Sequence, residues 1–282
     1  MSISASDIQK IVAAEDDFGH EMRVGAAIQA VPGFEVQHGG TYTDPVTGKP
    51  RQFDYRCSLK KGTTTLVLAV ECKNLNPAFP LIICGTGRRE GEAFHDLIYS
   101  LAGGATATQA GETVVGPRSA TYRALRNQSF YRTGGFVGKS LLRLKPEGGK
   151  SAVPVAGPDS DVYEKWAQAL SSAVELVKIA FDCAQLRPTI VSAILPAVVV
   201  TDESLWKVSY GCDGKMASAP ELVDQCEFYV GRRVRNMPDV FMFSHIHFFT
   251  LSAFASFLSK MAVNDHAWET LFDSGLLRFG PG

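Results

Sequence analysis

Apolar and polar residues along the first third of the chain predict one helix followed by three strands. Residues 5–31 carry apolar side chains at rough helical spacing and end at Pro32-Gly33, a pattern typical of a single helix. Strand-like segments follow at 34–42, 52–59 and 64–71. A Pro/Gly turn at 44–48 separates the first two, and Lys60-Lys-Gly62 separates the last two. We therefore expect a helix and an antiparallel meander with short connections.

The remainder of the chain predicts further elements around a long central stretch of weak periodicity. We expect helices at 89–101, 161–184 and 254–261, and strands at 197–201, 205–210, 227–232 and 244–251. Between them, residues 102–160 are rich in Gly, Thr and Ser and predict a mostly irregular excursion. No repeat and no Pro- or Ser-rich linker interrupts the chain. The prediction is a single α/β domain over 1–282, with a core at 5–101 and 161–282 and an insertion at about 102–160.

Composition excludes several classes of protein. A chain with 45% hydrophobic and 20% charged residues has the make-up of a soluble globular protein. The first ten residues lack the basic start and apolar stretch of a signal peptide, and no apolar run is long enough to span a bilayer. Six cysteines are scattered without a CxxC pair, so we expect reduced core thiols in a cytoplasmic protein.

The distribution of charge changes the picture given by the net charge of −1. Residues 118–150 contain eight basic residues and one acid, which gives this segment +7 and leaves −8 for the rest of the chain. Clustered cations beside an acidic body favour a polyanionic partner, although a solvated basic loop has the same composition. The candidate nucleic-acid contacts are Arg118, Arg123, Arg126, Arg132, Lys139, Arg143 and Lys145.

Candidate chemistry lies at the end of the third predicted strand, where an apolar run leads into Glu71-Cys72-Lys73. Side chains two apart on a strand point to the same face, so Glu71 and Lys73 project together and Cys72 faces the opposite side. A tight hairpin would lay Asp54, from the preceding strand, beside them. Charged groups at the end of a buried strand are costly, and two converging carboxylates suit Mg²⁺.

This arrangement resembles the PD-(D/E)XK nuclease superfamily. A helix bearing an acid, a hairpin with Asp54 and an apolar strand ending in Glu-x-Lys carry the resemblance, which covers the order helix–strand–strand–strand–helix across residues 5–101. The family's proline before the aspartate is replaced here by Phe53. The resemblance implies a restriction-endonuclease-like fold, that is, a mixed central sheet flanked by helices, with the central segment as a long insertion.

The resemblance also implies a mechanism. Asp54, Glu71 and the backbone carbonyl of Cys72 would bind Mg²⁺, or Mn²⁺ in its place, to activate water, and Lys73 would orient that water. The family's first helix often supplies a further acid, for which Glu21 fits best and Glu15 is the alternative. Asp213-Gly-Lys215 matches the same short motif, but Asp-Gly is turn chemistry and no apolar strand leads into it.

The function expected from the resemblance is a metal-dependent endonuclease of a restriction, defence or repair type. DNA is favoured as the substrate, and a ribonuclease of the same fold or a catalytically silent nucleic-acid-binding module are the alternatives. The retention of Asp54, Glu71 and Lys73 together argues against the silent module. Nucleases of this fold often act as dimers, so a homodimer, or a partner protein that supplies specificity, is expected.

Overall fold

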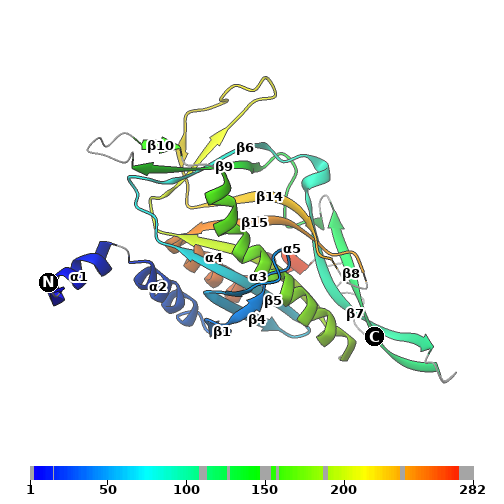
Figure 1. The fold of residues 1–282 in the computed structure, drawn as a ribbon. Helices are drawn as coiled ribbons and strands as arrows, with labels where there is room; N and C mark the ends of the chain where they lie inside the picture. The colour runs from blue at the N-terminus through cyan, green and yellow to red at the C-terminus, as the bar shows by residue number, and fades with distance from the viewer. Residues whose placement is uncertain are drawn as a thin grey trace.

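The computed structural model describes residues 3–14, 16–107, 113–125, 128–146, 154–156, 159–186, 190–235 and 239–272. Over these residues the chain is an α/β protein with a large mixed sheet and five α-helices (Figure 1). The predicted fold class is confirmed at this level. No helix in these ranges is long and apolar enough to cross a membrane.

The N-terminal region contains two helices in place of the single one predicted. They are α1 (Ala5–Ala14) and α2 (Asp17–Gln29). The side chain of Asp16 accepts a hydrogen bond from the Gly19 amide at 3.1 Å and so caps the start of α2. This new helix start interrupts the apolar periodicity that had suggested one continuous helix. Figure 1 shows α1 standing away from the sheet, whereas α2 lies against it.

The predicted antiparallel meander is confirmed. It consists of β1 (Phe34–His38), β4 (Tyr55–Lys61) and β5 (Thr64–Lys73), and β4 pairs with both neighbours. The segment predicted as one strand at 34–42 is divided, because Gly39 and Gly40 take positive φ angles of 66° and 144°. Residues after this break form a separate hairpin of β2 (Thr41–Thr43) and β3 (Pro50–Gln52).

The central region differs most from prediction, because it is built of strands. These are β6 (Leu81–Gly87), β7 (Phe94–Ala107), β8 (Thr113–Leu125), β9 (Phe136–Pro146) and β10 (Pro154–Ala156), with a short 3-10 helix at Glu90–Glu92. The predicted helix at 89–101 is therefore wrong, as is the irregular character predicted for 102–160 where the structure describes it. β7 and β8 form a long hairpin, and β9 lies between β14 and β6 inside the main sheet. The described parts of 102–160 thus contribute to the sheet.

The predicted helix at 161–184 is confirmed as α3 (Asp159–Leu186), which leads into β11 (Val191–Val200). β11 runs parallel to β5, with Val198 opposite Glu71 and Val200 opposite Lys73. β15 (Met242–Thr250) lies parallel on the other side of β11. The carboxyl ends of β5, β11 and β15 therefore meet at one edge of the sheet.

The remaining elements complete the sheet and its second helical layer. They are β12 (Leu205–Ser209), β13 (Glu221–Leu222), β14 (Gln225–Arg233), α4 (Leu251–Val263) and α5 (Asp265–Phe272). Within the described residues 13 strands join, along the order β1-β4-β5-β11-β15-β14-β9-β6-β12-β13, with β7 paired to β11 and β8, and β10 paired to β9. Asp213-Gly-Lys215 lies in a turn, as expected, with Gly214 at a φ of 77°.

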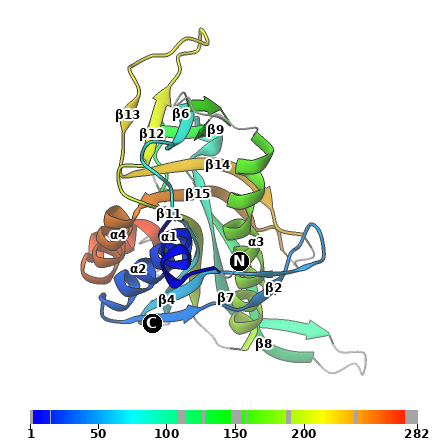
Figure 2. The ribbon, with the colours of Figure 1, turned by 60° about the vertical axis from the view of Figure 1, so that its left-hand side comes forward.

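Helices cover both faces of this sheet. α3 lies on one face, and α2, α4 and α5 lie on the other (Figure 2). Alternate residues of β5 enter the two cores: Ala69 packs in the cluster that contains α3, and Leu68 and Val70 pack in the cluster that contains α2 and α4. This alternation fixes which face each charged residue at the end of β5 occupies.

All six cysteines are free thiols. Cys57, Cys72 and Cys226 are buried, which agrees with the prediction of core thiols, whereas Cys183 and Cys212 are exposed. Cys183 lies near the end of α3 and Cys212 in the turn after β12.

Candidate active site

Glu71 and Lys73 lie together at the carboxyl end of β5. Because Ala69 packs on the α3 side, Glu71 and Lys73 face that side, and Cys72 enters the opposite core, as predicted. The Glu71 side chain is 3% exposed, and its Oε1 accepts a hydrogen bond from Lys73 Nζ at 2.5 Å. A nearly buried carboxylate is thus paired with an ammonium group that is still 24% exposed.

Asp54 is fixed beside this pair by the backbone of the neighbouring strand. Its Oδ2 accepts a hydrogen bond from the Cys72 amide at 2.6 Å. The Asp54 carbonyl accepts from the Gly39 amide at 2.8 Å, and the Phe53 amide donates to the Gly40 carbonyl. A Cβ atom at Gly40 would lie 2.5 Å from the Phe53 ring, so only glycine permits this close approach.

The electrostatics of the three residues reflect burial and mutual interaction. Burial, together with the Asp54 charge, raises the pKa of Glu71 to about 7 against the opposing effect of Lys73. Burial also raises the pKa of Asp54, although the Cys72 amide and Lys73 act in the other direction. Burial tends to lower the pKa of Lys73, but the Glu71 and Asp54 carboxylates outweigh it and raise that pKa. Perturbed groups of this kind gather at functional sites.

Glu21 of α2 also reaches this region. Its charge contributes to the raised pKa of Asp54 and of Glu71, after the larger effect of burial. Its Oε1 is hydrogen-bonded to His38 Nε2 at 2.7 Å. Glu21 therefore lies near enough for its charge to act on Asp54 and Glu71, whereas Glu15 lies outside the described residues.

The helix α2 is held against the sheet by two contacts that set the position of Glu21. The buried His20 ring bonds through Nε2 to the Val199 carbonyl of β11 at 3.1 Å. Gly25 lies directly against Tyr55, because a Cβ atom there would be 2.3 Å from the tyrosine hydroxyl oxygen. These contacts place the face of α2 that carries Glu21 beside the start of β4.

The donor set fits a hard divalent cation. Oxygen atoms Oδ1 of Asp54 and Oε2 of Glu71 accept no hydrogen bond from any described residue, and magnesium and manganese prefer carboxylate oxygens. As they stand, no three His, Cys, Asp or Glu side chains of the described ranges converge closely enough to enclose a metal ion. A cation here would be bound by the carboxylates of Asp54 and Glu71, the Cys72 carbonyl and water. Glu21 is the candidate for a further carboxylate ligand.

Within the described residues, the predicted basic residues fall into separate groups. Arg118 and Arg123 lie on β8 and Lys139, Arg143 and Lys145 on β9, and these strands are well separated in both ribbon views. Arg126 is outside the described residues, as are the side chains of Arg118 and Lys145. Arg132 lies between the two strands and is exposed.

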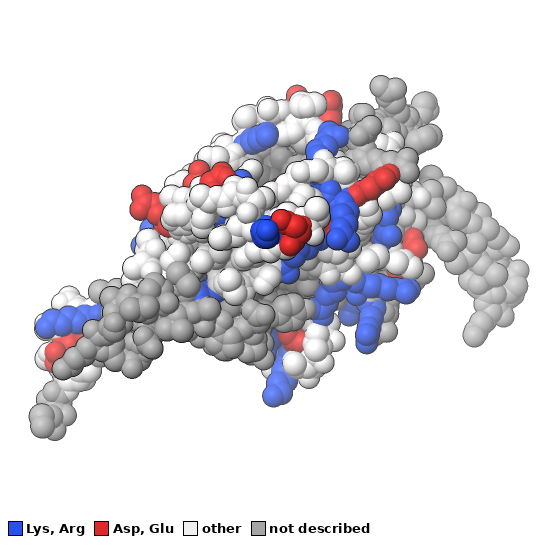
Figure 3. Space-filling view, turned by 90° about the horizontal axis from the view of Figure 1, so that it is seen from above, with Lys and Arg blue, Asp and Glu red and all other residues white. Residues whose placement is uncertain are grey.

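Two of these cations are also neutralised by acids. Arg123 forms a bidentate ion pair with the buried Asp96, with Nε 2.6 Å from Oδ1 and Nη2 2.7 Å from Oδ2. Lys139 Nζ lies 2.6 Å from Glu92 Oε1. On the face seen in Figure 3, at the β9 end of the molecule, acidic side chains lie among the basic ones. In the part of the chain that the structure describes, the basic residues that are close in the sequence therefore do not form a single basic patch.

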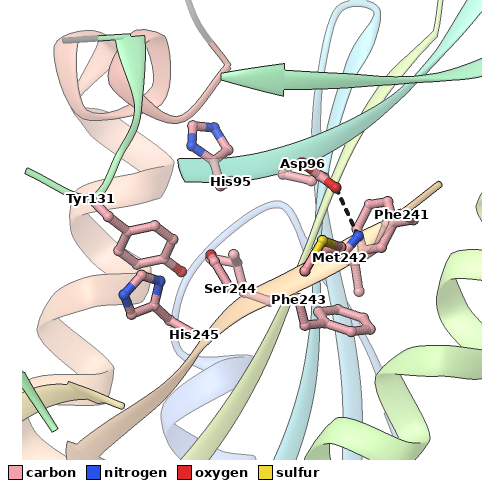
Figure 4. A pocket seen from close by; sticks show the side chains of 11 residues that line it. His95, Asp96, Tyr131, Phe241, Met242, Phe243, Ser244 and His245 are labelled. Atoms are coloured by element: carbon pink, nitrogen blue, oxygen red, sulfur yellow. Dashed lines mark hydrogen bonds between the residues drawn. The ribbon is translucent and has the colours of Figure 1, made fainter. Parts of the chain in front are cut away.

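A small internal cavity lies elsewhere, between β7 and β15. It has a volume of about 10 Å³, the space of about one water molecule, and none of the candidate catalytic residues lines it. Figure 4 shows His95, Tyr131 and His245 around it. His245 and His247 are both buried. The cavity is too small for a substrate and belongs to the packing of the core.

Sequence reasoning missed His38, which lies beside Asp54. In the pairing of β1 with β4, His38 stands opposite Tyr55, the residue that follows Asp54. Its ring stacks on Tyr55 with centroids 4.6 Å apart. Only the strand register, which the hairpin of β2 and β3 obscures in the sequence, could have identified it. Comparison with protein-family models, curated proteins and solved structures found no match for this chain.

Proposed function

We propose that this chain is a metal-dependent nuclease that hydrolyses phosphodiester bonds, with Asp54, Glu71 and Lys73 in its active site. The observation that carries the proposal is the buried Glu71–Lys73 pair with a second carboxylate, Asp54, bonded to the same strand. If Glu71 and Lys73 were only a structural ion pair, the nearby negative charge of Asp54 would not stabilise it. Two adjacent carboxylates make the ionisation of each other more costly. A divalent cation relieves that cost.

The topology supports the same proposal. The chain order α2, β1, β4, β5 agrees with the helix–strand–strand–strand part of the order on which the resemblance to the PD-(D/E)XK superfamily depends, whereas β7 stands where its last helix was expected. The next α-helix along the chain is α3, which follows the strands β6 to β10. A mixed sheet with helices on both faces is what a restriction-endonuclease-like fold requires.

The residues of the site can perform the steps of phosphodiester hydrolysis. Asp54, Glu71 and the Cys72 carbonyl would hold Mg²⁺ or Mn²⁺, which when bound supplies an activated water and offsets charge on the phosphate. Glu71 orients Lys73 through Oε1. The Lys73 ammonium has further protons to donate to the attacking water or to a phosphate oxygen, where it stabilises the negative charge of the transition state.

DNA is the proposed substrate, with RNA as the alternative. The predicted phosphate contacts on β8 and β9 are partly paired with acids, so the basic residues favour neither substrate. The arrangement of Asp54, Glu71 and Lys73 beside one another favours a catalytic protein over a silent binding module. A cleavage assay distinguishes all three possibilities.

The test is cleavage of supercoiled plasmid, single-stranded DNA and RNA with Mg²⁺ or Mn²⁺. We expect the wild type to cut only with the metal, and Asp54→Asn or Lys73→Ala to lower the rate at least ~100-fold, since each removes a group that acts on the transition state. The matched controls are Asp213→Asn and Lys215→Ala, which change the same short motif in the exposed turn. A wild type that binds without cutting, or site variants that cut like the controls, would refute the proposal.

A further inference from the structure

His38 and Glu21 form a polar pair at the border of the candidate active site. The distance from His38 Nε2 to Glu21 Oε1 is 2.7 Å. An ionised carboxylate can only accept hydrogen bonds, so Nε2 carries the proton and donates. Oε2 of Glu21 makes no hydrogen bond with any described residue. One carboxylate oxygen of Glu21 is thus bound by His38, and the other can accept a further ligand.

Both partners of this pair are fixed in place by other elements. The His38 ring lies nearly parallel to Tyr55, with an interplanar angle of 17°. Tyr55 in turn lies against Gly25 of α2, the helix that carries Glu21. The contact of His20 with Val199 anchors the same helix to β11. These contacts therefore position the His38 ring beside the start of β4, next to Asp54.

The charges of the pair act on the acids of the candidate site. The Glu21 carboxylate adds to the raised pKa of Asp54, for which burial is the main cause, and the His38 ring acts on Asp54 in the opposite direction. Glu21 adds in the same way to the raised pKa of Glu71. Three carboxylates so placed repel one another unless a cation lies among them.

We infer that His38 is a positioning residue of the active site, which holds Glu21 by one oxygen so that its other oxygen can join Asp54 and Glu71 around a divalent cation. The inference rests on the proposed function, since it concerns the same metal. Partners that orient metal ligands in this way typically change metal affinity 10- to 100-fold when they are removed. His38 acts through Glu21 and touches no reacting atom.

Two substitutions separate this role from a merely structural one. His38→Phe keeps a ring that can stack on Tyr55 but removes the donor. His38→Gln removes the ring but keeps an N–H donor at a similar reach. Positioning through the hydrogen bond requires that Gln preserves metal binding and that Phe does not, whereas a packing role requires the reverse.

The experiment is calorimetric titration of the full-length chain with MnCl₂, without nucleic acid. We expect His38→Phe and Glu21→Gln each to weaken Mn²⁺ binding about 10- to 100-fold, and the double variant to be no weaker than Glu21→Gln, because both act on one ligand. His38→Gln is expected within about threefold of the wild type, by the same estimate. The matched control is His266→Phe, which changes an exposed histidine of α5. Should His38→Phe not fold, His38→Leu takes its place.

The results distinguish the inference from the proposed function. If Glu71→Gln abolishes Mn²⁺ binding while His38→Phe binds like the wild type, the metal site stands and the role of His38 is wrong. The inference also fails if His38→Gln binds as weakly as His38→Phe. If the wild type binds no Mn²⁺, or Glu71→Gln leaves binding unchanged, the metal site itself is wrong and the role of His38 with it.

Discussion

At the scale of single residues, Glu71 shows the cost of placing a carboxylate at the end of a core strand. Its pKa, raised to about 7 chiefly by burial, means that the folded protein holds the proton more tightly than the unfolded chain, for which the value is 4.5. Between these pH values the unfolded chain releases its proton first. The stability contributed by the protonated side chain is therefore complete at low pH and is lost as the pH rises from about 4.5 to about 7.

Replacement of Glu71 by glutamine is expected to stabilise the metal-free protein at pH 8, by about 1–3 kcal/mol, because it removes a buried charge. Near pH 4.5 the gain should be small, since the native carboxyl is already neutral there. Urea denaturation at the two pH values measures this difference. Glu35→Gln on the exposed side of β1 is the control and should change little at either pH. Lower stability of Glu71→Gln at pH 8 would contradict the expectation.

The candidate site could be predicted in part because its three central residues depend on local geometry. Strand alternation puts Glu71 and Lys73 on one face, and a tight hairpin brings Asp54 to them. His38 depends on the pairing of β1 with β4 across an interrupting hairpin of 12 residues, from Thr41 to Gln52. The pairing of Arg123 with Asp96 could not be predicted, because Asp96 lies on β7, in a segment predicted as a helix.

At the scale of elements, the predictions succeeded where local pattern and tertiary structure agree. The meander and α3 follow their apolar periodicity. β7 does not: Phe94, Leu97, Ile98 and Leu101 have helical spacing, yet the segment pairs with β8 on both sides of a register shift and also with β11. Pairing of this kind overrides local preference, and a single sequence does not reveal it. Elements whose partners are distant in the chain were therefore the ones missed.

The packing of α2 on the meander gives a prediction at this scale. Gly25→Ala would place a methyl group 2.3 Å from the Tyr55 hydroxyl oxygen and 2.7 Å from the ring carbon that carries it. Overpacking of this kind costs about 1–3 kcal/mol, and we expect the free energy of unfolding to fall by that amount. Because Tyr55 and α2 must move apart, the His38–Glu21 contact should loosen and Mn²⁺ binding should weaken as well.

Gly91→Ala is the control for this substitution. A Cβ atom at Gly91 would meet no other atom within 4 Å, so the same change should alter stability by less than about 0.5 kcal/mol. Chemical denaturation and Mn²⁺ titration of both variants provide the comparison. Equal effects of the two substitutions would mean that the contact between Gly25 and Tyr55 does not control the position of α2.

At the scale of the whole molecule, a buried polar network joins strands that are distant in the sequence. Arg88, just after β6, donates to the Arg132 carbonyl and to His245 Nε2, and it pairs with Glu227 of β14. The Tyr131 hydroxyl is 2.6 Å from His247 Nε2. The network thus links β6, β14, β15 and the segment before β9. Its histidines are buried close to the Arg88 guanidinium, and both burial and this positive charge favour their neutral forms.

Burial followed by the Arg88 charge lowers the pKa of His245 to about 2 and that of His247 to about 3, against 6.5 in the unfolded chain. Below pH 6.5 the unfolded chain therefore binds protons that the native state excludes. The stability due to the neutral histidines is present above pH 6.5 and is lost as the pH falls from 6.5 towards 3. Between pH 7 and pH 5, each histidine should lower the free energy of unfolding by about 2 kcal/mol. Glu71 changes stability in the opposite direction over this range, so the wild-type curve alone cannot isolate the histidines.

His247→Gln isolates one of them, because glutamine does not titrate. At pH 7 the variant is expected to be less stable than the wild type, since it disturbs the contact with Tyr131. At pH 5 this penalty should be smaller by about 2 kcal/mol, because the wild type has lost that much and the variant has not. Urea denaturation at both pH values gives the two penalties, and His266→Gln, on the exposed side of α5, should give a penalty that does not change. A penalty for His247→Gln that is equal or larger at pH 5 would mean that His247 accepts a proton inside the folded protein, and the network would then have to open on acidification before the chain unfolds.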